Sequence, residues 1–311
     1  MNYRELIDPE LRKSAKSFPF NKPVVAVGNV YQGAEWRFVK APEGIREEEI
    51  EIEGSQGHLF RTSVFTPAVA DDYLPALLYV HGGAFVYKAA SYQKRLAFIY
   101  AEKAECKVFF PHYRLAPKFR FPAAYEDVLS LCRYMMEHAI ELGIDPDRIG
   151  IGGDSAGGSI AALICCQWER EKISMPCLQM LAYPVTDAEM VTDSMKRFTD
   201  TPKWNARNNE RMWNYYCGEN QGLRKQASPM QAVLPGKIPQ TYIETAQFDC
   251  LHDEGLLFAR KLKEAGADVE INDTQGTFHG YDDAFDAQIV RKNIERRISF
   301  LRKRFGGDLQ R

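Results

Sequence analysis

The sequence predicts an α/β fold, in which a mostly parallel central sheet is flanked by helices and carries a helical cap from the N-terminus and an insertion. Short, nearly continuous apolar runs recur along the chain, and a helical stretch follows most of them. Strands without polar alternation are buried on both faces, and repeated strand-then-helix order indicates right-handed crossovers between parallel strands. The predicted strands are residues 76–80, 107–112, 148–152, 178–183, 241–245 and 269–273. The predicted helices are residues 92–104, 123–142, 156–170, 253–265 and 282–304.

The residues before this alternation of strands and helices have a different sequence pattern. Apolar residues spaced among charges predict one or two short amphipathic helices over residues 2–18, and the pattern of residues 20–42 is irregular. Residues 45–53 and 58–66 alternate polar with apolar side chains and are separated by Gly-Ser-Gln-Gly. This arrangement predicts an antiparallel hairpin.

One connection between predicted strands, residues 188–227, is far longer than usual and rich in Trp, Tyr, Asn and Arg. We expect it to be an inserted lid. Trp36, Trp204 and Trp213 fall in this insertion or in the N-terminal segment, so the two parts either pack together over one end of the sheet or form an irregular peripheral layer. The predicted division is an N-terminal cap segment 1–44, a first core part 45–187, a cap insertion 188–227 and a second core part 228–311.

Composition and charge narrow the class of protein. With 45% hydrophobic and 26% charged residues in 311, the chain can bury a core, and its net charge of −2 gives no basis for binding nucleic acid. The longest small, apolar stretch, residues 155–166, is too short to span a membrane, and the first residues lack a hydrophobic signal core. Seven cysteines without C-x-x-C or zinc spacing predict reduced thiols in a cytoplasmic protein without a metal or cofactor.

The strongest local signal is the run Gly153-Asp154-Ser155-Ala156-Gly157-Gly158, which lies where a predicted strand ends and a helix begins. A strand-to-helix turn with glycines two residues before and after a serine is the context of a nucleophile elbow. The glycines allow the sharp turn and the close packing that expose the serine hydroxyl. Ser155 is therefore the predicted nucleophile.

A serine hydroxyl needs a base to remove its proton, and in this fold class the triad follows the chain order Ser, acid, His. His279, in the loop before the last helix, fits that position. The acid should end the preceding strand, which favours Asp249 over Asp253 and Glu254, whose place at a helix start is explained by the helix dipole. The other histidines are read as structural: His58, His81, His112, His138 and His252.

The oxyanion of the tetrahedral intermediate needs N–H donors. One predicted donor is the amide of Ala156, directly after the nucleophile. The others lie in the segment after the strand 76–80, where Gly82 and Gly83 let bare amides face a substrate. Taken alone, this glycine pair would be read as a flexible turn.

With these pieces in chain order, the sequence resembles the hormone-sensitive-lipase-like branch of the α/β-hydrolase esterases, the bacterial family IV type. The resemblance runs from about residue 76 to the C-terminus, interrupted by the insertion. The motifs that carry it are Gly153-Asp154-Ser155-Ala156-Gly157-Gly158, His81-Gly82-Gly83-Ala84, Tyr113-Arg114-Leu115-Ala116-Pro117, and residues 249–254 with His279-Gly280. It implies a metal-free carboxylesterase with a cap over the site. The roles that it implies are Ser155 as nucleophile, His279 as base and then acid, Asp249 as orienter, and Gly82, Gly83 and Ala156 as oxyanion donors.

Two residues depart from the family pattern. Ala84 replaces a third glycine, which puts in question a third oxyanion donor and activity on bulky tertiary alcohols. Cys250 stands where the family often has proline, and we expect it to loosen the loop while the carboxylate of Asp249 stays in place.

The predicted function is hydrolysis of short to medium acyl esters by a serine carboxylesterase through an acyl-enzyme. The alternatives are a deacetylase of acetylated sugars or small molecules on the same triad, and a non-catalytic ligand receptor on the same fold. The expected partner is a small-molecule ester substrate. The last predicted helix leaves a homodimer open, since its charged residues suit solvent as well as another subunit.

Overall fold

The computed structural model describes residues 3–69 and 73–306, so the outermost residues of the predicted first and last segments, 1–2 and 307–311, lie outside the described residues. Its eight-stranded sheet has the order β1-β2-β4-β3-β5-β6-β7-β8. All pairs from β4 onward are parallel, and the pairs that involve β2 are antiparallel. The strands are β1 (Ile45–Glu53), β2 (Leu59–Pro67), β3 (Leu74–Val80), β4 (Lys107–Pro111), β5 (Ile144–Asp154), β6 (Leu178–Ala182), β7 (Gln240–Phe248) and β8 (Val269–Phe278). The predicted fold class is confirmed.

Burial explains why these segments are strands. All seven residues of β3 are buried, as expected of a central strand covered on both faces. In β1, at the edge of the sheet, most side chains are exposed and Ile52 is one of the few buried ones. The hairpin turn between β1 and β2 includes Gly57 at a φ of +72°, a left-handed conformation that favours glycine.

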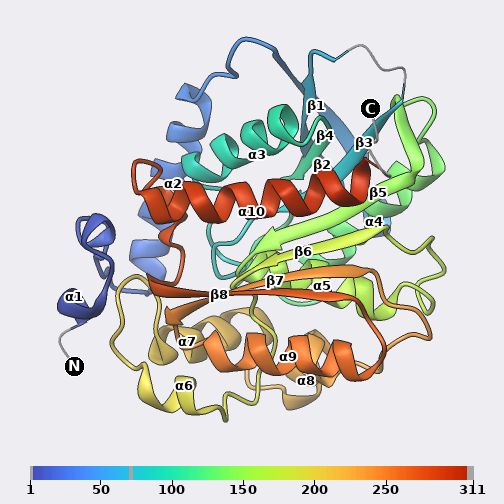
Figure 1. Cartoon of the computed structure of the whole chain (residues 1–311). Helices are drawn as coiled ribbons and strands as arrows, with labels where there is room; N and C mark the ends of the chain where they lie inside the picture. The colour runs from blue at the N-terminus through green and yellow to red at the C-terminus, as the bar shows by residue number, and fades with distance from the viewer. Residues whose placement is uncertain (1–2, 70–72, 307–311) are drawn as a thin grey trace.

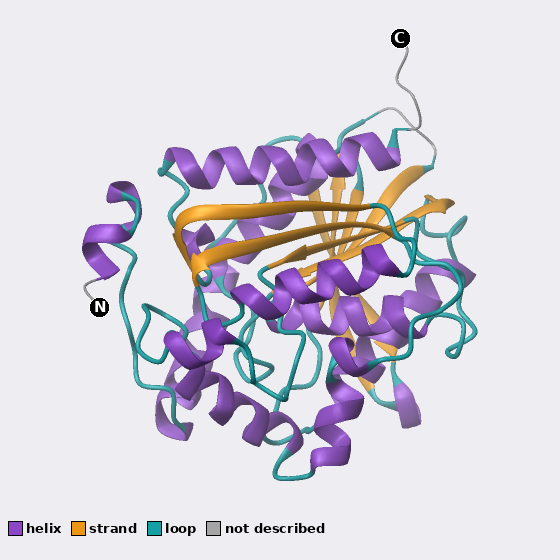
Figure 2. Cartoon of the chain, turned by 60° about the horizontal axis from the view of Figure 1, so that its bottom comes forward, coloured by secondary structure: helices purple, strands orange, loops and turns teal. Residues whose placement is uncertain are grey.

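Helices cover both faces of the twisted sheet (Figure 2). Figure 1 shows α3 and α10 on one face and α5 and α9 on the other. The helices of this core are α3 (Ser91–Lys103), α4 (Ala123–Glu137), α5 (Ala156–Gln167), α9 (His252–Glu264) and α10 (Gln288–Phe305). Within the described ranges, none of the helices combines the length and the apolarity needed to cross a bilayer.

Helix α10 begins later than the sequence predicts. Gly280 has a left-handed φ of +66°, and Tyr281–Asp283 then form a separate 3-10 turn. Asp282 points into the core, where its carboxylate meets the guanidinium of Arg297 at 2.8 Å. This buried ion pair ties the turn to α10, which contains Arg297.

The segment predicted to be irregular contains the 17-residue helix α2 (Lys22–Phe38), so that prediction is wrong. Asn21 caps the helix, since its side chain accepts a hydrogen bond of 3.1 Å from the Val24 N–H. Val27 and Val30 are 70% and 75% exposed. Because these apolar residues do not lie on one buried face, the helical period is hidden in the sequence.

The two segments predicted to form a cap touch one another beyond the carboxyl ends of the strands. The rings of Phe20 and Trp204 lie 5.1 Å apart, and the Arg211 guanidinium donates to the Phe20 carbonyl at 3.3 Å. Trp36 differs, since its ring packs on Phe110 of β4 at 4.9 Å. In Figure 1, α1, α2, α6 and α7 gather at one end of the sheet. The bounds of the short helices are α1 (Tyr3–Leu6), α6 (Asp193–Arg197), α7 (Ala206–Cys217) and α8 (Gln221–Ala227).

Candidate active site

Ser155 lies at the turn between β5 and α5, with a φ of +53° and a ψ of −117°. This strained backbone conformation presents the hydroxyl at the N-terminus of α5. An added Cβ on Gly153 would come within 2.5 Å of the Val80 carbonyl oxygen, and one on Gly157 would overlap the same oxygen. Gly153 and Gly157 are therefore required by the close approach of β3.

A chain of hydrogen bonds joins Ser155, His279 and Asp249. The Ser155 Oγ lies 2.8 Å from His279 Nε2, and His279 Nδ1 lies 2.6 Å from Asp249 Oδ2. Asp249 is fully buried, and its other oxygen accepts the Leu251 N–H at 3.0 Å. With Nδ1–H donated to the carboxylate, Nε2 is the acceptor that faces the serine hydroxyl.

The two carboxylates that follow Asp249 are engaged elsewhere. Asp253 contacts His252 Nδ1 at 2.8 Å, and its other oxygen accepts the Ser194 N–H at 2.7 Å. Glu254 is buried and accepts the Thr186 N–H at 2.7 Å. Burial raises the pKa of Glu254 well above its usual range. Neither residue is hydrogen-bonded to His279.

The predicted oxyanion donors need one revision. The Gly82 N–H donates to Asp154 Oδ1 at 3.0 Å in a buried contact, so it is already committed and we remove it from the donor set. In the described part of the chain, the N–H groups of Gly83, Ala84 and Ala156 have no protein acceptor. Ala84 has a φ of +55°, which is the conformation that a glycine would adopt easily.

Asp154 is a functional residue that the sequence reasoning missed. Its carboxylate also accepts Gln93 Nε2 at 2.7 Å and the Tyr79 hydroxyl at 3.1 Å. Burial raises the pKa of Asp154, while these donors and the Gly82 N–H oppose the shift. The side chain therefore ties Asp154, the residue before the nucleophile, to Gly82. We call residues 81–85 the oxyanion segment. The sequence did contain a signal for this role, since Asp154 is an acidic residue inside an otherwise small and apolar strand-to-helix motif.

His81 supports the same segment from the other side. Its ring stacks on Tyr113 at 4.3 Å, and its Nδ1 lies 2.6 Å from the Gly82 carbonyl oxygen. The Tyr113 hydroxyl donates to the His81 carbonyl at 2.8 Å. Burial lowers the pKa of His81 to about 4, so the imidazole is neutral near pH 7 and donates from Nδ1.

Acid stability should report on this buried imidazole. Because His81 has a lower pKa in the folded state than in the unfolded state, the unfolded chain gains its proton first, and stability falls as the pH drops from about 6.5 towards 4. Between pH 7 and pH 5, we expect H81N to lose about 2 kcal/mol less unfolding free energy than the parent. Urea titrations at both pH values measure the difference. H138N, on an exposed ring, is the control, and equal losses in H81N and the parent would contradict the assignment.

An aromatic cluster that includes residues of both predicted cap segments lies next to His279. The rings of Trp204 and His279 are 6.0 Å apart, and Phe20 packs on Trp204, on Tyr87 at 6.0 Å and on Tyr215 at 5.6 Å. We call Phe20, Trp204 and Tyr215, together with Tyr87 of the loop after β3, the cap aromatic cluster.

Two further aromatic residues of the insertion serve packing. Trp213 and Tyr216 are buried, and the Tyr216 ring stacks on Phe85 at 3.7 Å. They are therefore part of the core between the cap and the oxyanion segment.

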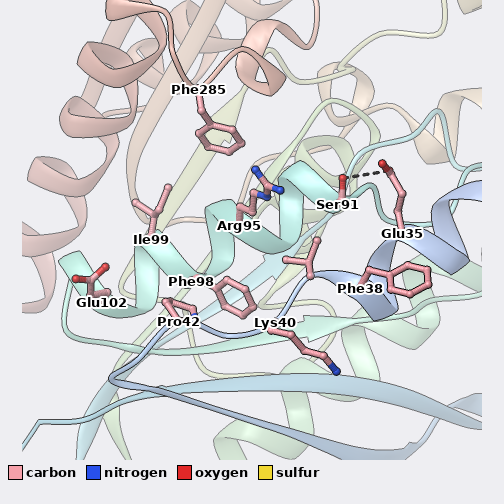
Figure 3. A pocket seen from close by; sticks show the side chains of 11 residues that line it. Glu35, Phe38, Lys40, Pro42, Ser91, Arg95, Phe98, Ile99, Glu102 and Phe285 are labelled. Carbon is pink, nitrogen blue, oxygen red and sulfur yellow. Dashed lines mark hydrogen bonds between the residues drawn. The ribbon is translucent and has the colours of Figure 1, made fainter.

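Two surface cavities lie outside the hydrogen-bonded chain of Ser155, His279 and Asp249. One, of about 590 Å³, lies between the end of α2, helix α3 and Phe285, with Arg95 and Ile99 on its α3 side (Figure 3). Figure 3 also shows Ser91 hydrogen-bonded to Glu35, at 3.1 Å. The other, of about 1030 Å³, lies between α2 and the β1–β2 hairpin and reaches His81 and Tyr113. None of the three hydrogen-bonded residues lines either cavity, so volume alone does not mark the reactive centre.

The chain is similar to known hydrolases and esterases. A family model described as alpha/beta hydrolase fold matches residues 77–283, a range that includes all three hydrogen-bonded residues. Ethyl acetate hydrolase of Pseudomonas putida is 32% identical over 246 residues, covering 78% of this chain and 77% of that protein. Carboxylesterase NlhH of Mycobacterium tuberculosis is 32% identical over 285 residues, covering 88% of each. A solved structure described as bacterial heroin esterase has a TM-score of 0.90 at 30% identity, and the match covers 97% of this chain and 98% of that one.

Proposed function

Because this chain belongs to the alpha/beta hydrolase family, in its hormone-sensitive-lipase-like branch, and is a carboxylic ester hydrolase, we propose that it cleaves esters through an acyl-enzyme on Ser155. The observation that carries the proposal is the hydrogen-bonded chain from Ser155 through His279 to Asp249. Serine activation requires this order of nucleophile, base and orienting acid.

In acylation, His279 Nε2 takes the Ser155 proton as Oγ attacks the ester carbonyl carbon. Asp249 keeps the imidazole in the correct tautomer and stabilises the imidazolium. The oxyanion forms near the N–H groups of Gly83, Ala84 and Ala156, which are free to donate. His279 then gives the proton to the departing alkoxide, which leaves as the alcohol.

Deacylation repeats these steps with water. His279 removes a proton from a water molecule, the hydroxide attacks the acyl carbonyl, and the proton returns to Ser155 as the carboxylic acid leaves. One imidazole therefore serves as base and acid in both halves of the reaction. Labelling with a fluorophosphonate, followed by peptide mapping, tests this step, because only an activated serine reacts. Label on any residue other than Ser155 would contradict the proposal.

We propose short to medium acyl esters as the substrate class, because the Trp204 ring lies 6.0 Å from the His279 ring and Phe20 packs on the other members of the cap aromatic cluster, and we expect these rings to limit the length of the acyl chain. On p-nitrophenyl esters from acetate to octanoate, we expect kcat/KM to fall by about tenfold or more beyond butyrate. W204A should move this limit to longer chains, whereas W168A, at the far end of α5, should leave it unchanged. A flat series in the parent would contradict a short acyl site.

A deacetylase of acetylated sugars or small molecules uses the same chemistry, so the series includes one acetylated sugar. A preference for the sugar would favour this alternative. The receptor alternative is not retained, because the chain is an ester hydrolase. We also propose a cytoplasmic location, since all seven cysteines are unpaired thiols, as is usual in a reducing compartment.

A further inference from the structure

Lys203 lies at a junction of three segments that are far apart in the sequence. Its Nζ donates to the carbonyl oxygen of Gly280 at 2.7 Å and forms an ion pair with Asp283 Oδ1 at 2.7 Å. Its backbone N–H donates to the carbonyl oxygen of Lys16 at 2.9 Å. One residue of the insertion thus contacts both the N-terminal segment and the loop after His279.

The contact with Gly280 is next to the reacting groups. Gly280 directly follows His279, and its φ of +66° marks the point where the chain turns after the imidazole. Trp204, the neighbour of Lys203, lies 6.0 Å from His279 between ring centroids. Lys203 itself has a φ of +57°, a conformation that a non-glycine residue keeps only when its surroundings hold it there.

The same loop is anchored to the core from beneath. Asp282 accepts the Tyr183 hydroxyl at 2.6 Å and the Arg297 guanidinium at 2.8 Å. Arg297 also pairs with Glu244 of β7, and all three charged side chains are fully buried. The core thus holds the loop at Asp282, and the cap holds it on either side, at Gly280 and Asp283.

The Lys203 pair differs from a surface ion pair. Its two side chains are 22% and 37% exposed, and burial lowers the pKa of Lys203 while Asp283 opposes that shift. The pair of Lys196 and Asp193 in the same insertion has a longer contact of 3.5 Å and side chains 68% and 95% exposed. Exposed pairs contribute little, whereas a partly desolvated ammonium that is also hydrogen-bonded to a carbonyl fixes geometry.

From these contacts we propose that Lys203 is a positioning residue, which joins the insertion and the N-terminal segment to the loop after His279 and so fixes the orientation of His279. Lys203 fixes Gly280 and Asp283 and thereby keeps His279 Nε2 aligned with the Ser155 hydroxyl. The inference rests on the proposed function, since it needs His279 to be the base.

The test compares K203M and D283N with the matched surface variants K196M and D193N, and with the conservative variant K203R. Each is assayed on p-nitrophenyl acetate and butyrate and by its inactivation rate with diethyl p-nitrophenyl phosphate, which depends on the same base. We expect K203M to lose about tenfold or more in kcat and in inactivation rate, because small misplacements of a catalytic group are costly. KM should stay within about twofold, since the ester-binding groups are unchanged.

D283N should show a smaller loss of the same kind, K203R should recover most of the activity, and the surface variants should match the parent. Thermal unfolding checks that each variant is folded, and D283N decides the matter if K203M is not. A parental kcat in K203M, or a loss confined to KM, would overturn the inference and leave the proposed function intact. Retained turnover in S155A would instead remove the proposed function itself.

Discussion

S155A is expected to lower kcat by about a millionfold on every ester, by analogy with serine knockouts in other triads. The reason is geometric, since the substitution removes the Oγ that lies 2.8 Å from His279 Nε2. The residual rate would come from the oxyanion donors and substrate binding alone. Stopped assays at high enzyme concentration, with active-site titration to exclude contaminating parent, measure it.

The matched control is S159A, which removes a buried hydroxyl one turn further along α5. We expect it to keep parental kinetics and to react with the fluorophosphonate, whereas S155A should not react. An S155A protein that keeps a substantial share of parental turnover would exclude Ser155 as the nucleophile.

D249N is expected to lower kcat by about ten thousandfold near neutral pH, by analogy with the same change in another serine hydrolase. The Asp249 carboxylate accepts from His279 Nδ1 at 2.6 Å, whereas an asparagine amide that donates there would favour the tautomer with its proton on Nε2. That tautomer cannot accept the serine proton. The pH dependence of kcat/KM measures the change.

D253N is the control for the acid, because Asp253 carries the same charge four residues later. Its partners are His252 and Ser194, so its loss should affect the start of α9 and leave kcat close to the parental value. Equal losses of kcat in D249N and D253N would mean that any disturbance of the loop at residues 249–253 lowers the rate. The role of Asp249 as the acid that orients His279 would then be contradicted.

Much of the fold was predictable because central strands must be apolar on both faces. The run that became β3 is buried at every position, and such a run has few alternatives to a central strand. Ser155, Asp249 and His279 were identified from strand ends and chain order, and they lie within hydrogen-bond distance of one another.

The sequence did not predict features that depend on distant partners. Helix α2 has exposed valines at positions 27 and 30, so its period is invisible until its tertiary contacts are known. The commitment of the Gly82 N–H to Asp154 joins residues 72 positions apart. The Lys203 contacts likewise join the insertion to the last loop. Neither local propensity nor periodicity carries information on such pairings.

The carboxylate of Asp154 has a consequence for protein engineering. It binds Gly82 on one side and Gln93 on the other, while its own backbone leads into Ser155. The nucleophile turn and the segment that carries the oxyanion donors are thus joined through Asp154, so neither can be replaced without the other. A loop graft at residues 81–85, intended to admit bulkier alcohols, would have to bring compatible residues at 93 and 154 with it.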